Sequence, residues 1–160
     1  MKVVEGGIAA KGKKFGIVVS QFNKAVTQKL LDGSLDCLRK HGASDEDIAV
    51  FWCPGAYEIP QVASRIAHSS SFDALICLGA VIRGETPHFD YICQECSRGI
   101  GDVSRAFSVP VMFGVLTTDT FEQAAERAGG SMGNKGWDAA LGAISMIDVF
   151  TTIAMDKSRG

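Results

Sequence analysis

Four short apolar runs recur along the chain, and each is followed by a segment whose apolar residues have helical spacing. The runs cover Phe15 to Ser20, Ile48 to Cys53, Ala74 to Leu78 and Val111 to Leu116. Unbroken apolar runs are typical of strands that are buried on both faces, as they are in parallel sheets. The sequence therefore predicts an α/β fold, a three-layer α/β/α sandwich with a four-stranded parallel sheet in the middle.

The composition favours one soluble domain spanning residues 1–160, with an N-terminal arm at 1–13 and a frayed tail at 156–160. With 160 residues, 46% hydrophobic and 21% charged, the chain can bury a substantial core. A net charge of −2 without a dense Lys/Arg cluster disfavours nucleic acid and anionic membranes as partners. No apolar run approaches the roughly 20 residues of a membrane span, and no targeting segment is recognisable. We expect a cytoplasmic protein.

The five cysteines are expected to be reduced thiols, because an odd number in such a chain argues against a disulfide framework. Cys93 and Cys96 form a CxxC motif, which occurs in redox and metal sites. No second CxxC or His pair completes a zinc set, and both residues lie on the apolar stripe of a predicted helix. We interpret them as small buried side chains, with redox or metal chemistry as the alternative.

Unusual residues cluster where the four predicted strands end. In open parallel sheets, ligands bind outside the carboxyl ends of the strands. The segments at these ends are 21–23, 54–58, 80–88 and 113–118. Their coincidence predicts a single ligand site at this edge of the sheet.

The stretch Leu78 to Asp90, LGAVIRGETPHFD, carries the most specific signal. Thr86 and Pro87 are typical of a helix start, with the Thr86 hydroxyl as cap and Pro87 at the first helical position. A helix N-terminus presents free N–H groups and a partial positive charge, which attract an anion such as phosphate. His88 on this first turn could transfer protons near neutral pH.

Each candidate also has a plain structural interpretation. His88 could be a solvent-facing histidine, and Glu58 could be a carboxylate favoured by a helix dipole instead of an acceptor for sugar hydroxyls. Phe22 could be a packing residue instead of a platform for a flat ring.

The later candidates are ambiguous in the same way. Phe113 lies inside a predicted strand and would by default belong to the core. Arg127 and Lys135 could serve solubility, although Arg is the preferred fork for phosphate. Glu85 opposes an anion unless its side chain points outward, in which case only its backbone N–H would help.

The C-terminal third predicts two further helices. Thr120 and Gln123 form a capping box for a helix ending near Arg127. Residues 129–136 are rich in glycine and are predicted to be flexible. The last helix, from about Trp137 past Phe150, is apolar on more than one face, which indicates contact with another subunit.

Five motifs together resemble the 6,7-dimethyl-8-ribityllumazine synthase family, over about Phe15 to Phe150. They are Gln21-Phe22-Asn23, CPGAYEIP from Cys53, GAVIRGETPHFDY from Gly79, PVMFGVLT from Pro110, and the closing ERAG and GNKGWDAA. The resemblance implies a flavodoxin-like sheet. It also implies an enzyme of riboflavin biosynthesis, a transferase that condenses 5-amino-6-(D-ribitylamino)uracil with 3,4-dihydroxy-2-butanone 4-phosphate and releases phosphate and water. It implies no metal and no organic cofactor.

The resemblance also implies a role for each candidate residue. His88 would shuttle protons, and Asp138 would orient charged groups. The phosphate would be bound by Glu85, Thr86 and Arg127. The pyrimidine and its ribityl chain would be bound by Phe22, Asn23, Ala56, Tyr57, Glu58, Ala80, Val81, Ile82, Phe113 and Lys135.

The family assembles as pentamers whose sites are shared, so Phe113, Arg127 and Lys135 would come from the adjacent subunit. The short segment 129–136 favours twelve pentamers in a hollow shell of sixty subunits, and riboflavin synthase is a candidate partner. Tyr57 and Asp138 stand where many members carry Phe and Glu. Two rivals remain: a flavin carrier without catalysis, and a shell protein whose site has lapsed.

Overall fold

Four parallel strands form the centre of the computed structural model, which describes residues 1–157. The strand order is β2-β1-β3-β4, so the predicted parallel sheet is confirmed. The last residues of the predicted tail, 158–160, lie outside the described residues, whereas its first residues belong to the final helix. The elements are β1 (Phe15–Ser20), α1 (Lys24–Lys40), β2 (Ile48–Cys53), α2 (Ile59–Ser69), β3 (Ala74–Ile82), α3 (His88–Ala106), β4 (Val111–Thr118), α4 (Phe121–Arg127), β5 (Ala128–Gly130), β6 (Gly133–Asn134) and α5 (Lys135–Lys157).

The inner strands explain the unbroken apolar runs. β1 pairs with both β2 and β3, with Phe15 opposite Ile48 on one side and Ala74 on the other. All six residues of β1 are buried, because helices cover both faces of the sheet at this point. The parallel pairing brings the carboxyl ends of all four strands to one edge, where the predicted site lies.

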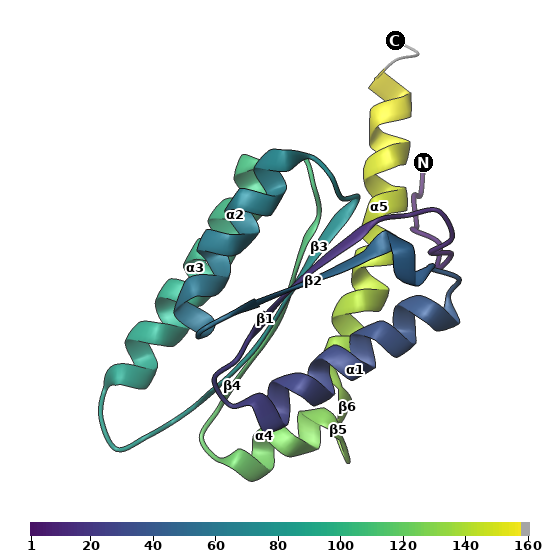
Figure 1. The fold of residues 1–160 in the computed structure, drawn as a ribbon. Coiled ribbons are helices and arrows are strands. Elements are labelled where there is room, and N and C mark those ends of the chain that lie inside the picture. Colours follow the sequence, from purple (N-terminus) through teal and green to yellow (C-terminus); the bar gives the residue numbers. More distant parts are fainter. Residues whose placement is uncertain (158–160) are drawn as a thin grey trace.

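Helices α1 and α5 cover one face of the sheet, and α2 and α3 cover the other (Figure 1). The first layer buries Leu30 and Leu38 of α1 and Ile144 of α5. The second buries Ile59 of α2 and Ile100 of α3. Each such side chain contributes about 1.5–3 kcal/mol when it is removed from water, so the two layers hold the strand ends in place.

Two segments differ from the sequence-based expectation near the site. β3 continues to Ile82, beyond the predicted Leu78, because Gly79 to Ile82 stay paired with β4. The helix that follows begins at His88, so Pro87 occupies the capping position and no side chain caps the helix. The predicted Thr86 cap is therefore wrong, since Thr86 lies one residue too early to perform it.

The glycine-rich segment before the last helix is ordered as a small antiparallel hairpin of β5 and β6. The Oδ1 atom of Asn134 accepts hydrogen bonds from the N–H groups of Gly136 at 2.8 Å and Trp137 at 3.2 Å. Its Nδ2 atom donates to the Lys29 carbonyl of α1 at 2.9 Å. The glycine-rich segment thus has regular structure that the sequence did not predict, and Asn134 both caps α5 and ties the hairpin to α1. The capping box of Thr120 and Gln123 is confirmed.

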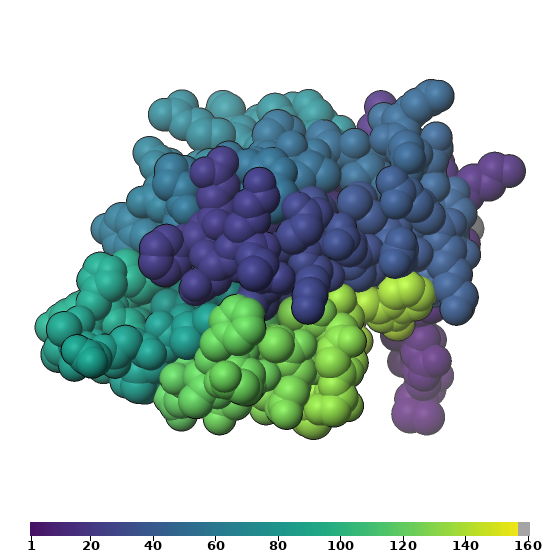
Figure 2. Space-filling model, turned by 60° about the horizontal axis from the view of Figure 1, so that its bottom comes forward, coloured from purple at the N-terminus to yellow at the C-terminus, as the bar shows by residue number. Residues whose placement is uncertain are grey.

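The N-terminal arm runs beside α5. The carboxylate of Asp148 on α5 accepts hydrogen bonds from the Gly7 N–H at 2.9 Å and from Lys13 Nζ at 2.6 Å. A Cβ atom at Gly6 would overlap the Ser145 carbonyl, so only glycine allows this close approach. Figure 2 shows the purple N-terminal segment projecting from the body of the molecule.

Helix α5 extends beyond the other helices at its C-terminal end (Figure 1). By length and hydropathy alone, Lys135–Asp156 could cross a membrane, with a mean hydropathy of 1.4. The core helix of a soluble protein passes the same criterion, and the first half of α5 packs on α1 and the sheet. Its far end exposes Phe150 and Ile153, which leaves apolar surface outside the core.

Candidate active site

A cleft of about 640 Å³ opens at the carboxyl edge of the sheet, as the sequence predicts. Its walls come from the segments that follow β1 and β2, from the last residues of β3 and the loop after it, and from the first turns of α3. The fourth predicted segment, 113–118, contributes no residue to the lining. The lining residues are Phe22, Asn23, Gly55, Ala56, Tyr57, Glu58, Ala80, Val81, Ile82, Gly84, Thr86, His88, Phe89 and Ile92.

The Gln21–Asn23 turn is fastened to both neighbouring strands. The N–H groups of Gln21 and Phe22 donate to the carbonyls of Cys53 and Pro54 at 2.8 and 3.0 Å. Asn23 has a left-handed backbone with φ 58°, and its Nδ2 donates to the Ala80 carbonyl at 2.9 Å. These bonds hold the Phe22 ring at the cleft, where 71% of the residue is exposed. Asn23 thus acts in the free protein as a brace between β1 and β3.

The segment after β2 turns sharply at Pro54 and Gly55 and forms a short 3₁₀ turn, Ala56–Glu58, before α2 begins. Ala56 is buried, whereas Tyr57 is exposed at the cleft. Within the described chain, no side-chain hydrogen bond or ion pair engages the Glu58 carboxylate. This carboxylate is therefore available to accept hydrogen bonds from a polyhydroxylated ligand.

The connection between β3 and α3 carries free backbone donors. Among residues 1–157, the N–H groups of Gly84, Glu85 and Thr86 make no hydrogen bond to the protein. Thr86 and His88 both line the cleft, and His88 stands exposed on the first turn of α3. Successive free N–H groups before a helix N-terminus form a favourable place for an anion. The side chain of Glu85 does not line the cleft, so it need not oppose the anion.

Besides Glu85, four candidate residues lie outside this cleft. Phe113 on the edge strand β4 is 47% exposed, so its default assignment to the core is wrong. Arg127 donates from Nη1 to the Gln123 carbonyl at 3.0 Å, within its own helix. Lys135 pairs with Asp138 at 2.9 Å on α5. The single chain therefore does not bring these residues to the cleft.

Four lining residues received no individual role from the sequence, although Gly55 and Gly84 lie inside the predicted segments 54–58 and 80–88. Phe89 and Ile92 were assigned only to the apolar stripe of the helix after β3, but this stripe begins in the cleft. Gly55 and Gly84 lie in the two turns, where the backbone itself forms the wall. The sequence could have indicated both glycines, because they directly precede the candidates Ala56 and Glu85 at the ends of predicted strands.

The CxxC motif lies away from the cleft lining. All five cysteines are free thiols. Cys96 is buried as expected, whereas Cys93 is only half-buried. Burial raises the pKa of Cys96 to about 12. It raises the pKa of Cys53 to about 11, and the nearby negative charge of Glu58 adds to this increase. In the described part of the chain, no group of three His, Cys, Asp or Glu side chains is gathered as a metal site would require. The packing interpretation therefore fits these cysteines better than the redox or metal alternative.

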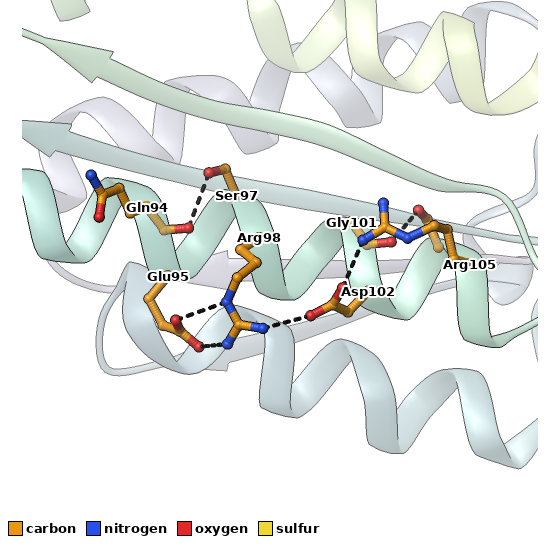
Figure 3. Close-up of polar contacts among 8 residues, drawn as sticks. Gln94, Glu95, Ser97, Arg98, Gly101, Asp102 and Arg105 are labelled. Carbon is orange, nitrogen blue, oxygen red and sulfur yellow. Dashed lines mark hydrogen bonds and ion pairs between the residues drawn. The ribbon is translucent and has the colours of Figure 1, made fainter.

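A second hollow of about 350 Å³ adjoins the cleft beside Tyr57, Glu58 and Glu95. Figure 3 shows that Glu95 belongs to a row of charged side chains on α3. Arg98 bridges Glu95 at 2.5 Å and Asp102 at 2.9 Å, so the Glu95 charge is already compensated. Glu58 remains the uncompensated carboxylate shared by the two hollows.

The cleft thus combines an exposed aromatic ring, a free carboxylate, an anion cradle and a histidine. The family model for 6,7-dimethyl-8-ribityllumazine synthase matches residues 12–151. The chain is also 57% identical to the 6,7-dimethyl-8-ribityllumazine synthase of Desulfatibacillum aliphaticivorans over 148 residues, which are 92% of this chain and 96% of that relative. Since both matches span nearly the whole fold, the chain belongs to the 6,7-dimethyl-8-ribityllumazine synthase family.

Proposed function

We propose that the cleft condenses 5-amino-6-(D-ribitylamino)uracil with 3,4-dihydroxy-2-butanone 4-phosphate to form 6,7-dimethyl-8-ribityllumazine. This is a transferase reaction of riboflavin biosynthesis, and membership of the family supports it. The observation that carries it is the convergence of Phe22, Glu58 and His88 with the free N–H groups of residues 84–86 on one cleft. In this order, these groups can stack on a flat ring, accept hydrogen bonds from a polyol chain, transfer a proton and bind a phosphate.

The pyrimidine substrate occupies the part of the cleft next to β1 and β2. Phe22 stacks on its ring, and the ends of β3 at Val81 and Ile82 contact its edge through the backbone. The ribityl chain runs toward Ala56 and Tyr57, where Glu58 accepts hydrogen bonds from its hydroxyls. The absence of a competing partner for Glu58 within the described residues supports this role.

The phosphorylated substrate occupies the cradle before α3. The N–H groups of Glu85 and Thr86 bind the phosphate, and the dipole of α3 adds to the attraction. Arg127 of a neighbouring subunit completes the anion site with its planar fork. Phe113 closes the far side of the ring, while Lys135 and Asp138 set the charge near the pyrimidine.

The reaction needs little beyond positioning and proton transfer. The amine of the pyrimidine attacks the ketone carbonyl, and loss of water gives an imine. Departure of phosphate gives an enol, and intramolecular attack with dehydration closes the second ring. His88 moves protons during these steps, while the cradle holds the leaving phosphate. Binding two substrates side by side supplies most of the rate enhancement.

The functional unit is a pentamer with shared sites, and twelve pentamers form a hollow shell in the cytoplasm. The exposure of Phe113 on β4 supports a covering neighbour. The placement of Arg127 and Lys135 outside the cleft of their own chain supports sharing as well. Riboflavin synthase, which uses the lumazine product, is a proposed partner of this assembly. Light scattering of the purified protein measures the assembly size.

A direct assay tests the function against its rivals. The purified protein is mixed with both substrates, and formation of the fluorescent lumazine is followed together with free phosphate. Stoichiometric release of lumazine and phosphate over many turnovers is expected. A protein that bound flavin but formed no lumazine would be a carrier, and one that did neither would be a shell protein. Either result would overturn the proposal.

A further inference from the structure

Arg83 is the first residue after β3, and it connects three segments around the cleft. Its N–H donates to the Thr118 carbonyl at the end of β4 at 2.9 Å. Its Nε atom donates to Asp119 at 2.8 Å, in the connection between β4 and α4. Its Nη1 atom lies 3.4 Å from a carboxylate oxygen of Asp90, on the first turn of α3. One side chain thus bridges the exits of two strands and the start of the helix that carries His88.

The guanidinium of Arg83 also stacks on a wall of the cleft. Its central carbon lies 4.2 Å from the centre of the Phe89 ring. Phe89 lines the cleft next to His88. Stacking of a guanidinium on an aromatic face is attractive and fixes the relative orientation of the two groups. The position of Arg83 is therefore coupled to the first turn of α3 through both Asp90 and Phe89.

The loop between Arg83 and this turn has little other support. A Cβ atom at Gly84 would meet no heavy atom within 4 Å. Glu85 and Thr86 are exposed, and within residues 1–157 their side chains make no hydrogen bond or ion pair. The conformation of residues 84–86 is consequently set by its two ends. Arg83 forms the first end, and it contacts the second through Asp90 and Phe89.

We propose that Arg83 is a positioning residue that keeps the N–H groups of residues 84–86 directed at the substrate phosphate. This inference rests on the proposed function, in which the loop binds that phosphate. Arg83 does not line the cleft, and its guanidinium already pairs with two carboxylates and stacks on Phe89, so it acts on the phosphate through the loop. Asp119 contributes to the same positioning, since its carboxylate accepts a hydrogen bond from Arg83 Nε.

Three variants separate positioning from direct charge. Arg83→Gln removes the guanidinium, Arg83→Lys keeps the charge without the planar fork, and Asp119→Asn removes one partner but leaves Arg83 in place. The matched control is Arg98→Gln. Arg98 also bridges two carboxylates on the protein surface, but it lies further along α3 (Figure 3). It has no contact with the loop.

The experiment measures kcat and KM for each substrate, and also the dissociation constant of inorganic phosphate by calorimetry. We expect all three test variants to raise the KM of the phosphorylated substrate and the dissociation constant of phosphate by about tenfold. The KM of the pyrimidine should change less than about twofold. Arg98→Gln should change none of these values. Thermal unfolding should be nearly the same for all variants, because exposed ion pairs contribute little stability.

Two outcomes would overturn the role of Arg83. If Asp119→Asn tightened phosphate binding while Arg83→Gln weakened it, Arg83 would be a direct phosphate ligand. If neither substitution altered phosphate binding or the KM values, the loop would not depend on Arg83. A wild-type protein that bound phosphate but formed no lumazine would instead refute the proposed function. The calorimetric comparison would still decide the role of Arg83.

Discussion

At the scale of single residues, His88 allows the clearest test of how the rate arises. His88 stands exposed on the first turn of α3 and lines the cleft beside Thr86. If positioning supplies most of the rate, His88→Ala should lower kcat by about tenfold to a hundredfold without abolishing turnover. Steady-state kinetics with both substrates measures this loss. Complete inactivity in a variant that still folds and binds both substrates would refute the positioning account.

Asn23 tests whether the brace between β1 and β3 matters for stability. Its left-handed backbone with φ 58° is strained for alanine but not for glycine, and both substitutions remove the bond to the Ala80 carbonyl. We expect Asn23→Ala to destabilise the fold by about 1–3 kcal/mol and Asn23→Gly by about 1 kcal/mol less. Chemical denaturation measures both values. Equal losses of unfolding free energy in the two variants would show that the left-handed backbone at this position does not disfavour alanine.

Prediction from the sequence was most successful for residues that directly follow strands. Phe22, Glu58 and His88 could be placed together because the ends of parallel strands share one edge. The default assignment of Phe113 to the core was wrong because the pattern of an apolar strand does not reveal whether a helix covers each of its faces. The role of Arg83 could not be predicted, since its partners lie on three segments whose relative placement depends on the fold.

At the scale of elements, the contact between the N-terminal arm and α5 should depend on pH. The hydrogen bond from Lys13 holds the pKa of Asp148 below its ordinary value, and the Gly7 N–H adds to this effect. Because the pKa is lower in the folded state, the stabilisation is present above the ordinary pKa of Asp and is lost as the pH falls through the folded value. Asp148→Asn should therefore lower the thermal unfolding temperature at pH 7, and its difference from wild type should shrink as the pH falls below the ordinary pKa of Asp.

Thermal unfolding of wild-type and Asp148→Asn protein from pH 3 to 8 measures this difference. Asp102→Asn is a suitable control, since Asp102 is a surface carboxylate on α3 that also pairs with arginines. A constant difference between Asp148→Asn and wild type at every pH would contradict the prediction. Hydrogen exchange at Gly7 would locate the loosening in the arm.

Helices and strands were predicted well where their boundaries depend on neighbouring residues, and badly where they depend on distant contacts. β1 and β2 were predicted with the bounds that the structure has, since turn residues delimit their apolar runs. The start of α3 was predicted one residue early, because Thr86 followed by Pro87 has the composition of a cap without its geometry. The β5–β6 hairpin was missed because its order comes from Asn134 and the distant Lys29 carbonyl, a contact without a local sequence signal.

At the scale of the whole molecule, one chain brings together only part of the proposed site. Phe22, Glu58 and His88 meet in one cleft, but Arg127 lies outside it. Arg127→Ala should therefore mainly raise the KM of the phosphorylated substrate, and its effect should arise in the neighbour's site. An unchanged KM and kcat for that substrate would remove Arg127 from the site.

Mixed assemblies decide whether the site is shared. His88→Ala and Arg127→Ala chains are co-expressed, so that each assembly contains both. If His88 and Arg127 of one site come from different subunits, random mixing leaves roughly a quarter of the sites with both native residues. At a concentration of the phosphorylated substrate well below the KM of Arg127→Ala, the mixture should then exceed the mean activity of the two separate variants. The control is co-expression of His88→Ala with a chain that carries both His88→Ala and Arg127→Ala. This mixture contains no native His88, so it creates no native site. If the first mixture gave only the mean of its components, each site would lie within one chain, and the exposed Phe113 would need another explanation.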